Sequence, residues 1–471
     1  MSQLPKGWVE TNFEDVSDYI QRGKGPKYAE FSEYPVVNQK AVRWFGIQEE
    51  HLKYVHPEQW DKWDEQRYIR EGDILWNSTG TGTIGRACHI DQTQLSKAKV
   101  VDSHITIVRT NKLVESRFAF YWIMHPEIQG NINGLYSGST NQVELSKKIV
   151  ESTRFPLAPL AEQTCIVKKL DEVLAKVEAT QARLARIPDI IKQFRQSVLA
   201  AAVSGKLTEE WRKPCPYQSI NKDLTAPSCW SKCYLGEIVN YVTSGSRGWA
   251  KYYSTNGSLF IRSQDISADK LIIEDAAFVD LPAKAEGTRT KVESFDLLVT
   301  ITGANVTKCA LVEVDLDDAY VSQHVALIRL ADSSNAKFLD LVLKAPNAGR
   351  KQLTSMAYGG GKPGLNLQNI KDVTFALPSQ EEQTEIVRRV EQLFAYADTI
   401  EQQAKAAKER VDNLTQAILA KAFRGELTAD WRAANPDLIS GDNSAAALLA
   451  RIQAERATTK PRKRATKTSA V

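Results

Sequence analysis

The amino-acid sequence contains an internal repeat, and this repeat limits the possible folds more than any other feature. The stretch "VSGKLTEEW" at 203–211 returns as "FRGELTADW" at 423–431, which sets the offset at 220 residues. Two further pairs agree at the same offset: "EQT" at 162–164 with 382–384, and "SHITIVR" at 103–109 with "QHVALIR" at 323–329. A repeat of this length indicates two similar structural units in tandem. We therefore interpret the chain as a duplication followed by a C-terminal tail.

The back part of each repeat carries apolar residues at alternating steps of four and three. This is the heptad pattern of a helix that packs on another helix. In the first repeat the seam consists of Ile166, Leu170, Val173, Val177, Leu184, Ile187, Ile191, Phe194 and Val198. In the second repeat it consists of Ile386, Val390, Leu393, Ala397, Ile400, Ala404, Ala407, Val411, Leu414 and Ile418. Because the seam recurs in register, we predict two long helices packed antiparallel as a coiled coil.

Three residues predict where these helices bend and end. Pro188 lies inside the first seam and should kink or restart that helix, because proline removes a backbone hydrogen bond. The second repeat has Lys408 at the same place, so its helix should run straight. Gly205 and Gly425 fit C-terminal caps, since glycine adopts the left-handed conformation without strain. We expect the segments after these glycines to fold back, with Trp211 packed under the helix end.

The front part of each repeat is rich in short β-branched stretches bounded by Gly, Asp and Asn, such as "HITIVRT" and "LLVTIT". This pattern favours strands, with a few helices such as the one expected over 115–132. We predict an α+β fold with two mixed, strand-rich domains separated by the coiled-coil helices in a pseudo-twofold tandem repeat. The expected divisions are 1–154 and 229–374 for the strand-rich domains, 155–212 and 375–435 for the helical regions, 213–228 for a linker, and 436–471 for a short helix with a basic, disordered tail.

Composition excludes several classes of protein. The sequence has no apolar run long enough to span a membrane and no secretion signal at its start. Its six cysteines are scattered, which is typical of free thiols in a reducing cytoplasm, where we expect the protein. Cys229 and Cys233 form the closest pair, but no second pair or nearby histidine completes a zinc site, so we expect no metal. The net charge of +4 neither requires nor excludes a nucleic-acid partner.

Catalytic motifs are also missing from the sequence. "GTGTIG" at 80–85 and "GGGKPG" at 359–364 satisfy a dinucleotide-binding spacing, but neither opens a helix after a strand. No nucleophile elbow, zinc-protease motif or amino-methyltransferase signature is found. His104 and His324 occupy matching repeat positions, yet no carboxylate or nucleophile recurs with both of them, which favours packed or edge histidines.

A duplicated chain without a repeated catalytic set is better suited to recognition than to catalysis. Antiparallel helices would relate the two halves by a pseudo-twofold axis, which duplex DNA shares along its length. Protein dimers read two half-sites about 10 bp apart. A single chain with two unlike domains could imitate such a dimer and recognise an asymmetric, split sequence. Half-sites of about 3–5 bp would then leave a gap of roughly 6–7 unspecified base pairs.

The residues also carry a family resemblance. The pairs "FPLAPLAEQTCIVKKLDEVLAKV" with "FALPSQEEQTEIVRRVEQLFAYADTIE", and "VLAAAVSGKLTEEWR" with "AILAKAFRGELTADWR", resemble the specificity subunit of type I restriction–modification enzymes, closest to the enteric IA group. The resemblance covers the whole chain and is strongest in the helical regions. It implies two target-recognition domains, each of which reads one part of a bipartite DNA site, and no catalytic residues in this subunit.

The same resemblance implies the partners. Two methylation subunits would dock on the helical regions, bind S-adenosylmethionine and methylate adenine in each half-site. Two motor-nuclease subunits, which use ATP and Mg, would complete the restriction enzyme. The specificity subunit itself would bind no cofactor.

Candidate DNA-contacting residues are polar or basic and lie in loops, where side chains can reach groove edges or phosphates. In the first domain they are Arg22, Lys24, Lys27, Asn38, Gln39, Lys40, Arg43 and Arg86. In the second domain they are Arg247, Arg262, Ser263, Gln264, Asp265 and Lys308. The resemblance adds residues of two corresponding glycine-containing loops, Ser139, Thr140, Asn141 and Lys362. Arg86 and Lys308 fit phosphate contacts best.

Two other classes of function remain open at this point. A coiled-coil interaction scaffold without DNA binding would explain the seam but not the two elaborate strand-rich domains. A stand-alone methyltransferase or nuclease would require catalytic motifs that the sequence lacks. Retention of a specific DNA duplex by the chain would distinguish DNA recognition from the scaffold. Cofactor binding by the isolated chain would identify the stand-alone enzyme.

Overall fold

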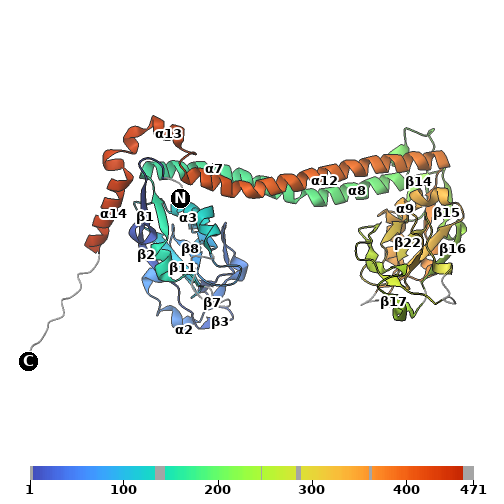
Figure 1. Cartoon of the computed structure of the whole chain (residues 1–471), viewed down its shortest axis with the longest axis horizontal. Coiled ribbons are helices and arrows are strands. Elements are labelled where there is room, and N and C mark those ends of the chain that lie inside the picture. The colour runs from blue at the N-terminus through green and yellow to red at the C-terminus, as the bar shows by residue number, and fades with distance from the viewer. Residues whose placement is uncertain (1–3, 133–143, 246, 283–287, 360–362, 460–471) are drawn as a thin grey trace, which may run out of the picture. The chain divides into compact units, whose positions relative to one another are not determined.

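The structure is a computed structural model that describes residues 4–132, 144–245, 247–282, 288–359 and 363–459 (Figure 1). The chain forms two compact units. Unit 1 contains Met1–Arg183 together with Ala407–Val471, and unit 2 contains Leu184–Ala406. The boundaries do not follow the repeats, because unit 1 takes its strand-rich domain from the first repeat and part of its helices from the end of the second.

The strand-rich domain of unit 1 is built on two four-stranded sheets. One has the order β2 (Ser17–Arg22), β11 (Ile105–Thr110), β8 (Ile74–Asn77), β9 (Ala87–His89). The other has the order β10 (Val100–Val101), β4 (Pro35–Val37), β7 (Lys53–Val55), β3 (Tyr28–Ala29). Two strand pairs complete the domain: β1 (Val9–Asn12) with β12 (Arg154–Leu157), and β5 (Val42–Arg43) with β6 (Gly46–Ile47). Its helices are α1 (Phe13–Val16), α2 (Pro57–Trp60), α3 (Ser116–Met124), α4 (Pro126–Gly130) and α6 (Lys147–Ser152).

The strand-rich domain of unit 2 repeats this topology strand for strand. Its sheets have the orders β16 (Val239–Ser244), β25 (Val325–Leu330), β22 (Leu297–Thr300), β23 (Cys309–Leu311) and β17 (Tyr253–Ser254), β21 (Phe278–Val279), β18 (Ser258–Ile261), β24 (Ala319–Val321). The pairs are β15 (Ser231–Tyr234) with β26 (Thr374–Leu377), and β19 (Ile266–Ser267) with β20 (Lys270–Leu271). Its helices are α9 (Ala336–Lys344), α10 (Gly349–Met356) and α11 (Leu367–Lys371). The predicted α+β class and tandem duplication are therefore confirmed.

The long helices break and end where the sequence predicts. The first repeat forms α7 (Leu160–Ala185) and α8 (Ile187–Val203), and the break falls beside Pro188 in the first turn of α8. The second repeat forms one uninterrupted helix, α12 (Gln380–Phe423). Gly205 and Gly425 follow the helix ends with φ of 75° and 73°, which confirms both as left-handed caps.

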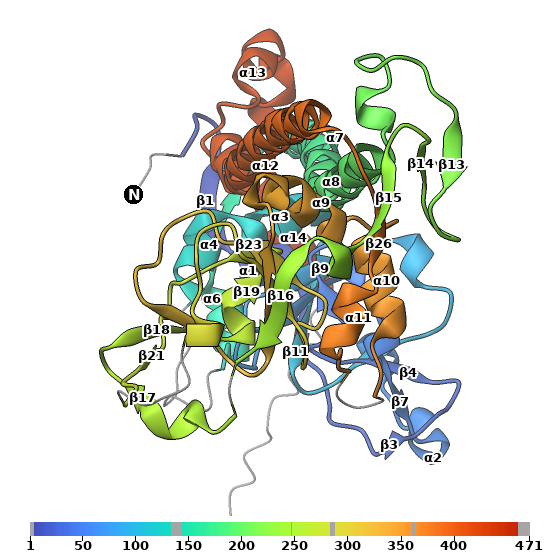
Figure 2. The ribbon, with the colours of Figure 1, turned by 90° about the vertical axis from the view of Figure 1, so that its right-hand side faces the viewer.

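Within each unit the helices pack antiparallel, as the pairs between them indicate. In unit 1, Gln181 donates to Asp412 over 2.9 Å, and Lys169 donates to the carbonyl of Leu427 over 2.9 Å, so the partner number rises as the first number falls. In unit 2, Arg195 lies 2.9 Å from Glu401. Figure 2 shows α8 and α12 side by side.

The heptad seam is the contact face of these helices. Its fully buried members are Ile166, Leu170, Val177, Ile191, Val198, Ile386, Val390 and Ala397. Partly buried members are Val173, Leu184, Ile187, Phe194, Leu393, Ile400, Ala404, Ala407, Val411 and Ile418. The prediction is wrong at Leu414, which is 43 % exposed; Thr415 takes the inward position, because the step after Val411 is four residues rather than three.

A buried carboxylate fastens each end of the helix pair, and we call these two sites the Glu162 clamp and the Glu382 clamp. Glu162 accepts hydrogen bonds from the Trp8 indole at 2.9 Å and the Thr428 hydroxyl at 2.7 Å, and forms an ion pair with Arg432. Both carboxylates lie in the first turn of their helix, where the helix dipole favours negative charge. The stretch that ends the second repeat thus binds the "EQT" stretch of the first.

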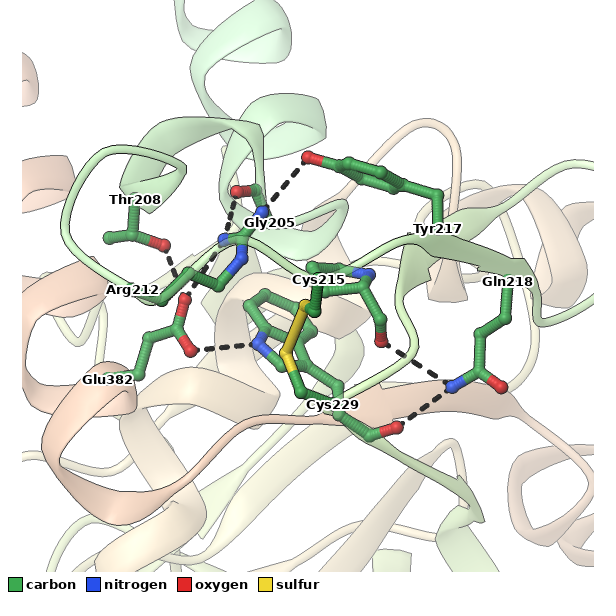
Figure 3. The surroundings of a disulfide bond; sticks show 10 residues. Gly205, Thr208, Arg212, Cys215, Tyr217, Gln218, Cys229 and Glu382 are labelled. Carbon is green, nitrogen blue, oxygen red and sulfur yellow. Dashed lines mark hydrogen bonds and ion pairs between the residues drawn. A yellow bond between two sulfur atoms is a disulfide. The ribbon is translucent and has the colours of Figure 1, made fainter.

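The Glu382 clamp is the reciprocal site (Figure 3). Glu382 accepts from the Trp230 indole at 2.9 Å, the Thr208 hydroxyl at 2.8 Å and Arg212 at 3.1 Å. The repeated sequence therefore serves to pair each helix end with the start of the other long helix. Our expectation for Trp211 is wrong: this side chain is 44 % exposed, and Thr208 and Arg212 are the residues that fold under the helix.

The segment after the first clamp contains a disulfide between Cys215 and Cys229, which corrects the expectation of six free thiols. Their Cα atoms are 6.4 Å apart, and the bond closes the hairpin of β13 (Tyr217–Ser219) and β14 (Thr225–Pro227) (Figure 3). Cross-linking a loop of about this length contributes about 3 kcal/mol in the chain-entropy account. The described residues contain no group of three or more potential metal ligands.

The C-terminal region returns to unit 1. After α13 (Ala429–Ala434), the predicted tail helix is present as α14 (Ala445–Thr459). Ala445, Leu448 and Ile452 of α14 are fully buried in the same hydrophobic core as α3 and α7. The basic segment 460–471 lies outside the described residues. In the part of the chain that the structure describes, no helix combines the length and apolarity needed to span a membrane.

We predict that Glu382→Ala destabilises unit 2, because it leaves the buried guanidinium of Arg212 and the indole of Trp230 without their shared acceptor. Removing one partner of a buried ion pair costs about 3–5 kcal/mol, which calorimetry should record as a melting temperature lower by several degrees. Glu426→Ala is the matched control, since its exposed pair with Arg424 should contribute nothing measurable. Equal melting temperatures for the two variants would contradict the clamp.

Candidate nucleic-acid interface

In each unit, three loops and the start of a strand meet along one edge, and we call these surfaces loop edge 1 and loop edge 2. Loop edge 1 comprises residues 22–24, 38–41, 78–86 and 103–104. Its parts are joined by hydrogen bonds from Ser78 N to the His104 carbonyl at 2.8 Å and from the Asn77 amide to the Gln39 carbonyl at 3.0 Å. Both sheets of the domain therefore contribute to one surface.

Loop edge 2 comprises residues 244–245, 247, 262–265, 301–308 and 322–324, and its frame is the same. Ile301 N donates to the His324 carbonyl at 2.9 Å, and the Asn305 amide donates to the Ser263 carbonyl at 3.1 Å. In both units a glycine of the loop edge lies against the backbone of the other sheet. A Cβ added at Gly23 or at Gly245 would lie 2.0 Å from a backbone oxygen there. Only glycine fits at these two places.

The first residue after β4 and after β18 is held inside the fold. Asn38 is 5 % exposed, donates to the His51 carbonyl and accepts from Lys40 N at 2.8 Å. Arg262 binds the buried carboxylate of Asp265 through two nitrogens, at 2.8 and 3.1 Å. The side chains of Asn38, Arg262 and Asp265 therefore shape the loops.

The residues that follow them are accessible. Lys40 and Gln264 are exposed at equivalent positions, and Gln39 and Ser263 are half-buried next to them. Among the predicted residues after β4 and β18, these four have side chains accessible at the surface.

The predicted basic residues at and after the end of β2 differ in exposure and in ion pairing. Arg22 pairs with Glu144 and donates to the Ser103 carbonyl, and burial lowers the pKa of its guanidinium. Lys24 is exposed. Lys27 is also exposed, with its ammonium 4.0 Å from Glu58, a distance at which surface charges interact weakly.

Arg43 and Arg86 form a positively charged pair beside loop edge 1. Arg86 donates to the carbonyls of Val42 at 3.4 Å and Gly82 at 3.3 Å, and burial together with the charge of Arg43 lowers the pKa of its guanidinium. Among the described residues, neither arginine has a carboxylate within ion-pair distance. Two close guanidiniums without an acidic partner favour an anionic ligand such as a phosphate.

Loop edge 2 carries its own cations. Lys308 is half-buried. It is equivalent to Arg86, because the carbonyl of each accepts a hydrogen bond of 2.8 Å from the backbone N of the last residue of the preceding strand, β22 or β8. Arg247 is exposed and lines, together with Arg289 and residues of β16, a shallow hollow of about 730 Å³. Cations therefore lie on loop edge 2 together with the exposed Gln264, as they do on loop edge 1 with Lys40.

The predicted residues of the two glycine-containing loops, Ser139, Thr140, Asn141 and Lys362, lie outside the described residues. Their flanks are described. Glu144 and Gly364, which come after these segments in the sequence, form β-bridges with Thr79 and Thr302.

Sequence reasoning missed one matched pair of supports. Arg109 binds Asp73 at 2.7 Å and lies over the ring of Tyr19 at 5.2 Å. Arg329 binds Asp296 at 2.6 Å and lies over Tyr241 at 5.3 Å in the same way. The arginines recur at the repeat offset and could have been found by that signal, but their carboxylate partners recur at a different offset.

Of the two predicted placements for the matching histidines, packed or edge, the structure shows the second. His104 and His324 are exposed, and each lies one residue before its strand rather than within it. Each ring binds a threonine of the neighbouring turn, which no sequence pattern indicated.

Comparison with known proteins gives consistent results. Residues 5–189 and 283–409 match the family described as type I restriction modification DNA specificity domain. The chain is 34 % identical, over 99 % of both sequences, to the type I restriction enzyme EcoKI specificity subunit of Escherichia coli K12. It is 42 % identical, over 72 % of both sequences, to the EcoBI specificity subunit of Escherichia coli.

Solved structures share the fold. The crystal structure of the HsdS subunit from Thermoanaerobacter tengcongensis is similar with a TM-score of 0.58 and 19 % identity, over 90 % of this chain and 98 % of that one. A chain from a structural study of the assembly and conformational transition of a type I R-M system gives a TM-score of 0.61 at 19 % identity, over 90 % and 99 %.

We predict that Arg262→Ala lowers the stability of unit 2, since it leaves the buried Asp265 carboxylate without its partner. The expected loss is about 1–3 kcal/mol, measurable as a lower melting temperature. Glu274→Ala, an exposed residue of the same unit, is the control and should leave the melting temperature unchanged. Arg262 would be a free surface residue if both variants melted like the wild type.

Proposed function

The chain belongs to the type I restriction–modification DNA specificity family, and from this premise we propose that it recognises an asymmetric, bipartite site in double-stranded DNA. It is the DNA specificity subunit of a type I restriction–modification system and a non-catalytic component of that enzyme. Each unit would read one half-site through its loop edge.

One observation carries this proposal: the two loop edges share a backbone frame but present different side chains. At the equivalent exposed positions, unit 1 has Lys40 and unit 2 has Gln264. Lysine donates to guanine O6 and N7, whereas glutamine can bind adenine through one donor and one acceptor. The same frame with different side chains is what two readers of different half-sites require.

The cations support binding to the DNA backbone. Arg43 and Arg86 in unit 1 lack acidic partners among the described residues, and Arg247 and Lys308 lie beside loop edge 2. Phosphate contacts position a protein on the duplex, and base contacts supply the specificity.

The partner subunits follow from the family. We propose that two methylation subunits with S-adenosylmethionine bind this chain and methylate one adenine in each half-site. Two motor-nuclease subunits with ATP and Mg would complete the restriction complex in the cytoplasm. The relatives named above are specificity subunits of such enzymes, which supports the assignment.

The coiled-coil scaffold without DNA binding remains the alternative function. Purified chain with its methylation subunits should retain a duplex of the cognate sequence in preference to a scrambled duplex. Equal retention of the two duplexes would favour the scaffold.

We expect the recognised sequence to consist of two half-sites separated by roughly 6–7 unspecified base pairs, because two readers one helical turn apart span about 10 bp between half-site centres. Mapping methylated adenine in the genome with and without this gene measures the motif. A single undivided site would contradict the proposal.

The two exposed reading positions can be tested against each other. Gln264→Ala should relax recognition only in the half-site read by unit 2, and Lys40→Ala only in the half-site read by unit 1. The expected loss of discrimination is about 1–3 kcal/mol at one base pair, measured by competition between duplexes that differ at that pair. Weakening that is uniform across all sequences would instead identify the side chain as a phosphate contact.

A further inference from the structure

Each loop edge carries an exposed histidine held by a threonine. The Nδ1 atom of His104 lies 2.6 Å from the Thr79 hydroxyl, and Nδ1 of His324 lies 2.5 Å from the Thr302 hydroxyl. The two histidines are related by the repeat offset, and each directly precedes the second strand of its sheet, β11 or β25. The pair has therefore been kept in both units, in the same geometry.

The neighbouring positions of the two loop edges carry different residues in the two units. Gln39 is replaced by Ser263, Lys40 by Gln264 and Arg86 by Lys308 in the equivalent places of loop edge 2. Residues that read different half-sites are expected to differ between the units. A side chain that is the same in both is suited to a feature that all half-sites share, which is the sugar–phosphate backbone.

The surroundings fix the ring in place. Thr79 forms a β-bridge with Glu144, and Thr302 forms one with Gly364. The carbonyl of His104 accepts a bond from Ser78 N at 2.8 Å, so both the ring and the backbone of this residue are held. A group held in place before binding loses less entropy when a ligand arrives.

This arrangement leaves the other ring nitrogen of His104 for a ligand. When the threonine hydroxyl donates to Nδ1, the neutral ring carries its proton on Nε2, which is then a hydrogen-bond donor. Among the described residues, Nε2 of His104 has no hydrogen-bond partner. In unit 2, the amide nitrogen of Gln323 lies 3.2 Å from Nε2 of His324, so a ligand at this nitrogen must displace the exposed Gln323 side chain.

We propose that His104 and His324 are equivalent DNA-backbone contacts, in which Nε2 donates a hydrogen bond to a phosphate oxygen of each half-site. Thr79 and Thr302 are positioning residues that set the tautomer and orientation of the rings. The proposal rests on the proposed DNA-reading function and adds to it a contact that does not depend on sequence.

Substitution of the histidine by asparagine or by glutamine tests the two ring nitrogens one at a time. Asparagine can replace Nδ1 and keep the bond to threonine, whereas glutamine reaches the position of Nε2. Full-length chain with its methylation subunits is assayed with the wild type, His104→Asn, His104→Gln and the exposed histidine outside the loop edges, His51→Asn, as control. The probes are the cognate duplex and duplexes with each specified base pair changed.

We expect His104→Asn to bind the cognate duplex about tenfold more weakly, which is the size of one hydrogen bond to a charged group. His104→Gln should stay within about threefold of the wild type, and His51→Asn should be unchanged. The order of preference among the altered duplexes should stay the same for all variants. Ethylation of individual phosphates should interfere at one position in each half-site for the wild type, and His104→Asn should lose that position in the first half-site only.

Three results would overturn the proposal. Wild-type binding by His104→Asn with weak binding by His104→Gln would mean that the ring only fastens the turn. A changed preference at one base pair would make His104 a base reader. Unchanged ethylation interference in His104→Asn would place the phosphate contact elsewhere. Failure of the proposed function is distinguishable, since the wild-type complex would then not prefer the bipartite duplex at all.

Discussion

The structure depends on two buried carboxylates that join the ends of the repeats. Glu162 and Glu382 are almost fully buried, and each gathers an indole, a threonine hydroxyl and an arginine from segments 150 or more residues away in sequence. A buried carboxylate is tolerated only when it is paired and hydrogen-bonded. Each clamp therefore specifies which helix end lies against which helix start, and apolar packing of a heptad seam could not specify this alone.

The clamps also explain why the compact units do not coincide with the repeats. The end of the second repeat closes on the start of the first long helix, so unit 1 contains residues from both ends of the chain. The seam between the helices is thin, with small alanines at Ala397, Ala404 and Ala407, and it allows close antiparallel packing. In each unit the strand-rich domain and the helix ends share one hydrophobic core.

The duplicated frame has parts that are the same in both units and parts that differ between them. The glycines that lie against the other sheet, the Tyr–Arg–Asp supports and the His–Thr pairs recur in both units and fix the loop edges. Lys40 and Gln264 occupy the same place on that frame with different hydrogen-bonding groups. The side chains at the positions of Lys40 and Gln264 can therefore differ without loss of the fold, because both are exposed.

The sequence by itself determined the duplication, the strand-rich domains, the helix break at Pro188 and the glycine caps, because local backbone rules and apolar periodicity decide these features. It also carried the family through the repeated helical stretches. Tertiary structure alone decided that Thr208 and Arg212 rather than Trp211 fold under the helix, that Leu414 faces outward, and that Cys215 meets Cys229. It likewise divided the predicted DNA residues into buried supports such as Asn38 and exposed ones such as Lys40. These outcomes depend on contacts between residues distant in sequence, which composition and spacing do not encode.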